Sequence, residues 1–314
     1  MTLAYFKKTR NTMSSNQTIV CFGEVLWDLL PSLSAEQAGG KIAGGAPMNV
    51  AYHAKVFGLQ SQMVSRVGVD DLGRELLVFL SDKGIPTSLV QRDHTFSTGT
   101  VNVQLDEKGS PSYEIVQPAA WDYIHPDEAA KQAVKAASAI VFGSLACRTE
   151  RTNKTLFELL ELATVRVFDV NLRPPFFSKN LLEKLLEKAT MVKMNDEELE
   201  TLSGWFGASG DEVDKMNYLK KQFQLDALIV TKGANGAAFL NETNHYTHPG
   251  FKVQVQDTIG SGDAFLGAFL SKLLKGASAE ECLETACAAG ALVATKKGAT
   301  PDYSPTELFQ KLNA

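Results

Sequence analysis

Asp257-Thr258-Ile259-Gly260-Ser261-Gly262-Asp263-Ala264-Phe265 is the stretch around which this chain is organised. Before it, Phe251, Val253 and Val255 alternate with polar residues, a pattern that predicts a strand. After it, apolar residues recur at helical spacing until Gly276, so a strand, a glycine turn and a helix are expected. Glycines and a small serine let the backbone approach a ligand, and the first helical turn leaves its N–H groups free. The turn is therefore a candidate anion site.

The carboxylate of Asp263, in the first turn of this helix, would repel a bound phosphate. Its presence makes chemical sense if it takes a proton from a hydroxyl that attacks the phosphate. The combination indicates phosphoryl transfer to an alcohol; the simpler alternative is that Asp263 only caps the helix. A dinucleotide-binding turn is disfavoured because Phe265 stands where the third glycine would be, and no G-x-x-x-x-G-K-[ST] string is present.

Length and composition predict one large domain. The chain has 314 residues, of which 44% are apolar and 21% charged, enough for a single α/β core. A net charge of −5 with scattered Lys and Arg argues against a nucleic-acid partner. The four cysteines include no C-x-x-C pair, which favours reduced thiols in a cytoplasmic protein, and no apolar run is long enough to span a membrane. We expect residues 1–17 to be a disordered extension and residues 18–314 to form the domain.

A second glycine segment is Gly44-Gly45-Ala46-Pro47-Met48-Asn49-Val50-Ala51, in which Pro47 suits the first turn of a helix. Backbone N–H groups and the amide of Asn49 can match several sugar hydroxyls, so this segment is a candidate polyol site. Simple packing against the sheet is the alternative. Asp28 comes soon after a predicted strand at residues 18–22, near the sheet edge where ligands bind in open α/β sheets.

Two stretches near the middle of the chain have a different pattern. Residues 97–105 and a run around residues 113–116 alternate between polar and apolar side chains, which predicts antiparallel strands. We expect a small β lid built from about residues 29–43 and 96–118. A sheet of so few strands is not stable alone in water. We therefore expect an apolar face of this sheet to pack on the core, on a substrate or on a second subunit.

From residue 126 onward, predicted helices and strands alternate, which favours a parallel sheet with helices on both faces. Three successive predicted strands end in polar or glycine-rich segments, at residues 169–173, 195–198 and 231–236. Each segment alone could be a cap or a turn. Together with Asp263, they outline a polar cleft along one edge of the sheet.

These motifs resemble the ribokinase-like sugar kinases, also called the phosphofructokinase-B family, over nearly the whole chain from Thr18. Both signatures of that family are present in order, at residues 44–51 and 257–263. Within the family, residues 23–31 and Ala119-Ala120-Trp121-Asp122 look most like those of bacterial and plant fructokinases. The resemblance implies a three-layer α/β fold, with a central, mostly parallel sheet, helices on both faces and a small β lid.

The function implied by the resemblance is transfer of the ATP γ-phosphoryl group to a sugar hydroxyl, most closely as in a fructokinase. A kinase of the same family could instead act on ribose, 2-keto-3-deoxygluconate or a nucleoside. An alternative from another class is a non-catalytic sugar or nucleotide sensor, because a fold does not fix a function. The intact glycine turn and Asp263 argue against the sensor.

The resemblance also implies roles for matching residues. Asp263 would be the base, with an anion hole and a fixed positive charge supplied by Gly260, Ser261, Gly262 and Arg173. The sugar would contact Asp28, Gly44, Gly45, Asn49, Asn171 and Asp263. The nucleotide would contact Asn195, Thr231, Gly233, Gly236, Gly260 and Gly262.

Cofactors and partners follow from the same resemblance. Asn195 and Glu198 match an N-x-x-E motif that helps hold water-bound Mg²⁺ on the phosphates of ATP. Asp257, Ile259 and Gly298 match a K⁺-binding loop seen in many members. The lid would close over the sugar to exclude water, and in several relatives it also forms the contact of a homodimer.

Overall fold

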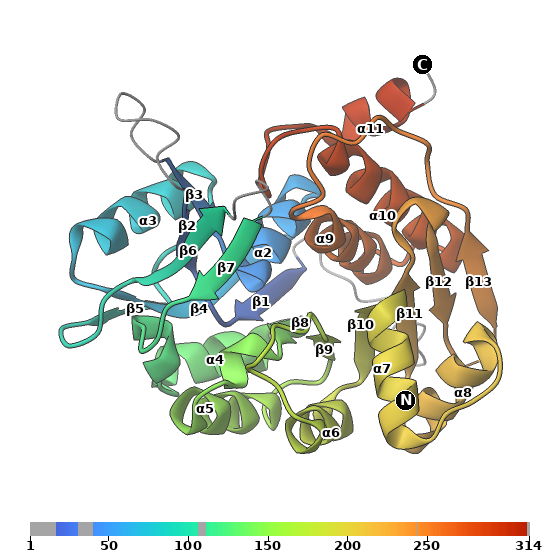
Figure 1. Cartoon of the computed structure of the whole chain (residues 1–314), viewed down its shortest axis with the longest axis horizontal. Coiled ribbons are helices and arrows are strands. Elements are labelled where there is room, and N and C mark those ends of the chain that lie inside the picture. The colour runs from blue at the N-terminus through green and yellow to red at the C-terminus, as the bar shows by residue number, and fades with distance from the viewer. Residues whose placement is uncertain (1–16, 31–39, 106–110, 243, 313–314) are drawn as a thin grey trace.

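The structure is a computed structural model that describes residues 17–30, 40–105, 111–242 and 244–312 (Figure 1). All of the predicted N-terminal extension except Gln17 lies outside the described residues, as does the 31–39 part of the predicted lid. No helix within the described ranges is long and apolar enough to cross a membrane.

The central sheet has nine strands and confirms the predicted α/β class. Every neighbouring pair from β11 to β5 is parallel, whereas β12 and β13 join antiparallel at one edge. The strand order is β13 (His245–His248), β12 (Ala237–Leu240), β11 (Ala227–Thr231), β10 (Met191–Asn195), β9 (Arg166–Asp169), β8 (Ala139–Gly143), β1 (Thr18–Phe22), β4 (Gln60–Gly68) and β5 (Val90–Asp93).

Helices cover both faces of this sheet, which gives three layers (Figure 1). Alternate residues of β1 enter different cores, since Ile19 and Cys21 pack in one cluster and Val20 and Phe22 in the other. The helices of the first cluster are α2 (Ala46–Val56), α3 (Asp71–Asp82), α9 (Ser261–Leu274) and α10 (Ala279–Ala294), with α11 (Pro305–Leu312) packed against α10. The helices of the second are α4 (Glu128–Ala136), α5 (Glu150–Leu160), α6 (Lys179–Lys188), α7 (Asp196–Phe206) and α8 (Glu212–Gln222).

A separate four-stranded sheet stands beside the central one (Figure 1), in the order β3 (Lys41–Gly44), β2 (Leu26–Leu29), β6 (Gly99–Leu105) and β7 (Pro111–Ile115). Its outer pairs are antiparallel as expected, but β2 and β6 run parallel. The reason is that β2 follows β1 and β6 follows β5, so both leave the same edge of a parallel sheet. The register places Val101 opposite both Asp28 and Ile115.

One prediction about local structure was wrong. Residues 251–255 form no strand, although their side chains alternate. The segment runs along the cleft with no neighbouring strand, and Phe251, Val253 and Val255 line the cavity described below. Asp28 lies beyond the carboxyl end of β1, as predicted, and belongs to β2 of the small sheet.

Candidate active site

A cavity of about 930 Å³ opens at the carboxyl edge of the central sheet, between the small sheet and the start of α9. Its wall includes the ends of β10 and β11, the start of α2 and the segment before α9. Except for Glu198, every predicted site residue lines this one cavity: Asp28, Gly44, Gly45, Asn49, Asn171, Arg173, Asn195, Thr231, Gly233, Gly236, Asp257, Ile259, Gly260, Ser261, Gly262, Asp263 and Gly298.

Asp263 lies in the first turn of α9, where Asn49 Nδ2 of α2 donates a 2.8 Å hydrogen bond to its Oδ2 atom. The two residues are 214 positions apart, so the fold joins both sequence motifs at one point. The surrounding protein, and then the charge of Asp169, raise the pKa of Asp263 to about 6, while Lys193, Asn49 and Arg173 oppose the rise. At neutral pH the carboxylate is mostly ionised, and its proton affinity is high enough for general-base chemistry.

The turn before α9 is tightly packed. Gly260 has φ 79°, and a Cβ atom there would lie 2.6 Å from the backbone of Ala299, so only glycine fits. The hydroxyl oxygen of Ser261 is buried and has no hydrogen-bond partner in the described part of the chain. A closely approachable backbone and an unpaired hydroxyl at a helix N-terminus are suited to an anionic ligand.

The small sheet and the loop after β9 also contribute polar groups to the cavity wall. Burial raises the pKa of Asp28 to about 6, against the opposing effect of the Arg173 charge. A Cβ atom at Gly44 would lie 2.9 Å from the Asp28 carboxylate, so the missing side chain leaves room for that group. Asn171 adopts φ 39°, a left-handed backbone that non-glycine residues rarely take and that recurs at functional loops.

Glu198 is the one predicted site residue outside the cavity wall. It forms a capping box with Asn195: the Glu198 N–H donates to Asn195 Oδ1 at 2.7 Å, and the Asn195 N–H to Glu198 Oε2 at 2.9 Å. Its Oε1 atom accepts from the Leu172 N–H at 2.8 Å. The carboxylate thus fixes two loops beside the cavity.

The described residues contain no group of three or more His, Cys, Asp and Glu side chains arranged for a metal ion. Mg²⁺ in phosphoryl-transfer sites usually keeps several waters and is held mainly by substrate phosphates with one or two carboxylates. Asn195 and Glu198 fit such a water-mediated role, because Asn195 lines the cavity and the Glu198 carboxylate lies directly behind it.

The predicted K⁺ loop is held together by Asp257. Its Oδ1 atom accepts from the Ile259 N–H and its Oδ2 atom from the Gly298 N–H, both at 3.0 Å. One carboxylate therefore connects the segment before α9 to the loop after α10. This connection gives Asp257 a structural role that does not depend on a cation.

Two charged residues of the site, Lys193 and Glu24, were missed among the predicted site residues, and Asp169 was predicted only as part of a polar strand end. Lys193 in β10 donates to both carboxylate oxygens of Asp169 at the end of β9, at 2.9 and 3.1 Å, and both side chains are buried. Glu24 is also buried, with its Oε2 atom unpaired among the described residues, and burial raises its pKa to about 7. A charged residue inside the otherwise apolar strand 191–194 was the signal for Lys193.

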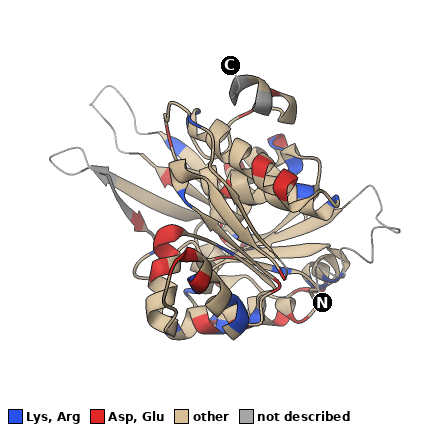
Figure 2. Cartoon of the chain, turned by 90° about the vertical axis from the view of Figure 1, so that its right-hand side faces the viewer, with Lys and Arg blue, Asp and Glu red and all other residues tan. Residues whose placement is uncertain are grey.

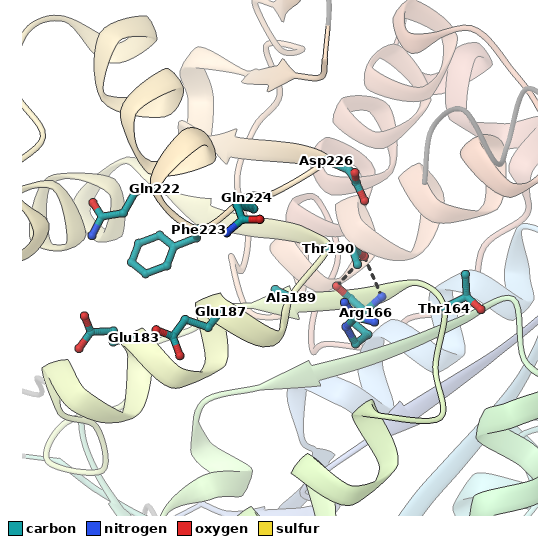
Figure 3. Close-up of a pocket in the computed structure, with 10 residues that line it drawn as sticks. All are labelled: Thr164, Arg166, Glu183, Glu187, Ala189, Thr190, Gln222, Phe223, Gln224 and Asp226. Carbon is teal, nitrogen blue, oxygen red and sulfur yellow. Dashed lines mark hydrogen bonds between the residues drawn. The ribbon is translucent and has the colours of Figure 1, made fainter. Parts of the chain in front are cut away.

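A second hollow, of about 840 Å³, lies at the opposite edge of the sheet, near the starts of β9, β10 and β11 (Figure 3). There Arg166 is occupied with backbone carbonyls, donating to Lys188 O and, at 3.0 Å, to Ala163 O. None of its ten described lining residues carries a buried polar atom without a partner. The cavity at the carboxyl edge is therefore the better candidate site. On the helices of the face in Figure 2, acidic and basic segments lie next to each other.

Comparisons with known proteins show which protein family the chain resembles. A family model described as pfkB family carbohydrate kinase matches residues 16–307. Fructokinase-2 of Solanum lycopersicum is 31% identical over 313 residues, covering 93% of this chain and 94% of that protein. A fructokinase with bound ATP from Xylella fastidiosa has a TM-score of 0.84 at 27% identity, over 95% of this chain and 99% of that chain. A fructokinase from Vibrio cholerae O395 in a fructose, ADP and calcium ion bound form has a TM-score of 0.80 at 25% identity, over 95% and 100%.

Proposed function

Because the chain belongs to the pfkB family of carbohydrate kinases, and is thus an ATP-dependent sugar kinase, we propose that it is a fructokinase. It transfers the γ-phosphoryl group of ATP to a hydroxyl of fructose. The observation that carries the proposal is the hydrogen bond between Asn49 and Asp263. It supports a proton acceptor located between residues 44–51, the candidate polyol site, and residues 260–262, the candidate anion site. The choice of fructose is supported because the similar sequence and the similar solved structures named above are all fructokinases.

In the proposed reaction, the oxygen of the sugar hydroxyl bonds to the γ-phosphorus, and Asp263 accepts the proton of that hydroxyl. The bond from that phosphorus to the ADP oxygen breaks in the same displacement. The backbone N–H groups at Gly260 and Gly262 and the unpaired hydroxyl of Ser261, whose own N–H donates to the Thr258 carbonyl, stabilise the charge on the transferring group. Bound Mg²⁺ would supply charge neutralisation on the phosphates, and Arg173 adds a positive charge at the cavity mouth.

Sugar recognition is proposed to use acceptors that the described protein leaves unpaired. Asn49 Oδ1 and Glu24 Oε2 are buried, lie on the cavity wall and have no partner. Each can accept a hydrogen bond from a sugar hydroxyl, which removes the cost of a buried unpaired acceptor. The Asp28 carboxylate is placed to take a third hydroxyl.

The small sheet is proposed to act as a lid. Val101, Val103 and Ile115 turn apolar side chains into the cavity, where they would exclude water from the reaction. We also propose that this sheet carries the contact of a homodimer. The four cysteines are free and buried, which fits action in the reducing cytoplasm.

The test is ADP release from ATP and Mg²⁺ with fructose, ribose, 2-keto-3-deoxygluconate, adenosine and fructose 6-phosphate as acceptors. We expect selective turnover of fructose, and a loss of about 10² to 10⁴-fold in kcat in the Asp263→Asn variant with sugar binding retained. Turnover of another acceptor would overturn the fructose assignment but keep the kinase. Near-normal turnover by the variant would remove Asp263 from the role of base.

A further inference from the structure

Lys193 is a buried lysine in a place where a buried charge is costly. Its ammonium group is paired with Asp169, and only 7% of the residue is exposed. A Cβ atom at Gly262 would lie 3.1 Å from Lys193 Nζ. The absence of a side chain at Gly262 therefore makes space for the ammonium group next to the turn at residues 260–262. A pair of this kind adds little to stability against apolar residues of similar size, which suggests a role in the site.

We propose that Lys193, held in place by Asp169 in a positioning pair, favours the ionised, proton-accepting state of Asp263 over the pH range in which the enzyme works. The inference deepens the proposed function, because it assigns the control of the proposed base to two residues outside the sequence motifs. Neither residue needs to touch the sugar for this role.

The surroundings of Asp263 show why the pair matters. Acidic or ionisable groups face it from three elements: Cys21 of β1, Glu24 after β1 and Asp169 of β9. Asp169 disfavours a second negative charge, and Glu24 does so where it is ionised, whereas the Cys21 thiol stays uncharged because burial raises its pKa. Positive charge comes from only two described neighbours, the exposed Arg173 and the buried Lys193.

Lys193 is the stronger candidate of these two cations, because solvent screens an exposed charge and screens a buried one much less. Asp169 in turn holds Lys193 in place, because both of its carboxylate oxygens accept hydrogen bonds from Lys193 Nζ, at 2.9 and 3.1 Å. The two members of the pair therefore act on Asp263 in opposite directions. Lys193 favours the ionised carboxylate, whereas Asp169 favours the protonated one.

Opposite signs give a sharp test. ¹³C NMR of Asp side-chain carboxyls in the free protein reports the titration of Asp263, assigned by its loss in Asp263→Asn. We expect Lys193→Met to move the midpoint to higher pH by about one unit or more, and Asp169→Asn to move it to lower pH. The acidic limb of the pH profile of kcat/KM should move in the same directions.

Lys215→Met is the matched control, because Lys215 forms an ion pair with Glu200 away from the cavity. It should leave the midpoint unchanged. If Lys193→Met alone does not fold, the double variant Lys193→Met with Asp169→Asn replaces it. The double variant removes both buried charges, so neither is left without its partner. There too the midpoint should lie at higher pH than in Asp169→Asn alone.

A midpoint that stays fixed, or that moves the same way in Lys193→Met and Asp169→Asn, would overturn the inference even if both variants lose activity. The NMR measurement needs no substrate, so it separates this inference from the fructokinase proposal. Opposite shifts in a protein that does not turn over fructose would keep the positioning pair and reject the substrate. Turnover of fructose without the shifts would do the reverse.

Discussion

At the scale of single residues, Asp263 shows a conflict between stability and chemistry. Its pKa is about 6 in the folded protein against 3.8 for an ordinary aspartate, so folding favours its protonated form. The stabilisation from this group is complete below pH 3.8 and is lost as the pH rises through 6. At pH 8 the ionised group lowers the free energy of unfolding by about 2 kcal/mol, allowing for solvent at its exposed side.

The Asp263→Asn variant should therefore be more stable than the wild type at pH 8, by about 2 kcal/mol, although it is expected to be inactive. At pH 4.5 the difference should fall to about 1 kcal/mol, because the folded aspartate is protonated there while the unfolded one is still mostly ionised. Urea unfolding at both pH values measures it. Asp71→Asn, which changes an exposed carboxylate of α3, is the control and should show no such pH dependence. Equal effects of Asp263→Asn at both pH values would contradict the expectation.

Residues in glycine turns could be predicted because their chemistry is local. Gly260 and Gly45 are required by backbone geometry that adjacent sequence already indicates, and Asn49 lies next to such a turn. Lys193 and Glu24 could not be assigned in the same way. Their importance depends on which distant carboxylates surround them, and a lone charged residue in an apolar run does not reveal its neighbours.

At the scale of elements, the Ala119-Ala120-Trp121-Asp122 segment has a structural role. It forms a short 3₁₀ turn, Ala120–Tyr123, where the lid returns to the core. Asp122 receives two hydrogen bonds of 2.7 Å from Arg148, whose guanidinium lies 3.8 Å from the Trp121 ring centroid. Arg148 also donates to the carbonyl of Val116, directly after β7, at 2.8 Å. This buried cluster therefore holds one end of the lid on the core.

Arg148→Met should lower the free energy of unfolding by about 3–5 kcal/mol, because it leaves Asp122 buried without its partner. Replacing both residues, as Asp122→Asn with Arg148→Met, should recover part of that loss. Urea unfolding of the wild type, both single variants and the double variant gives the coupling energy. A cost below about 1 kcal/mol for Arg148→Met would mean that the pair does not anchor the lid.

Elements with a clear period could be predicted, and those without one could not. The helix after Asp263 and the strand at residues 18–22 were confirmed as α9 and β1. The antiparallel strands β12 and β13 were not predicted, since Ala237–Leu240 is a short apolar run with no alternation. Residues 251–255 have the alternation of a strand but no neighbouring strand to bond with, and only the tertiary arrangement could show this.

At the scale of the whole molecule, the cavity joins distant parts of the chain. Its walls come from residues between Glu24 and Ala299, so both motifs and the small sheet must be in place for it to exist. In Figure 1, α2 and the small sheet lie on one side of α9, and β11 and β12 lie on the other; residues 231–236 and 250–260 complete the lining there. Ligands on the two sides should therefore stabilise different parts of the fold and, because both sides are built on the same central sheet, the whole fold as well.

Hydrogen exchange in the presence of one ligand at a time tests this division. Fructose alone should slow exchange mainly in β2, β3 and β6, and MgADP alone mainly in residues 231–236 and 250–260. Each ligand at 100 times its Kd should also raise the free energy of unfolding by about 2.7 kcal/mol, because it binds only the folded protein. The pattern should persist in Asp263→Asn, since the substitution removes proton transfer and not the binding surfaces. If MgADP protected β2 and β6 and left residues 250–260 unchanged, the two sides of the cavity would have been assigned the wrong way round.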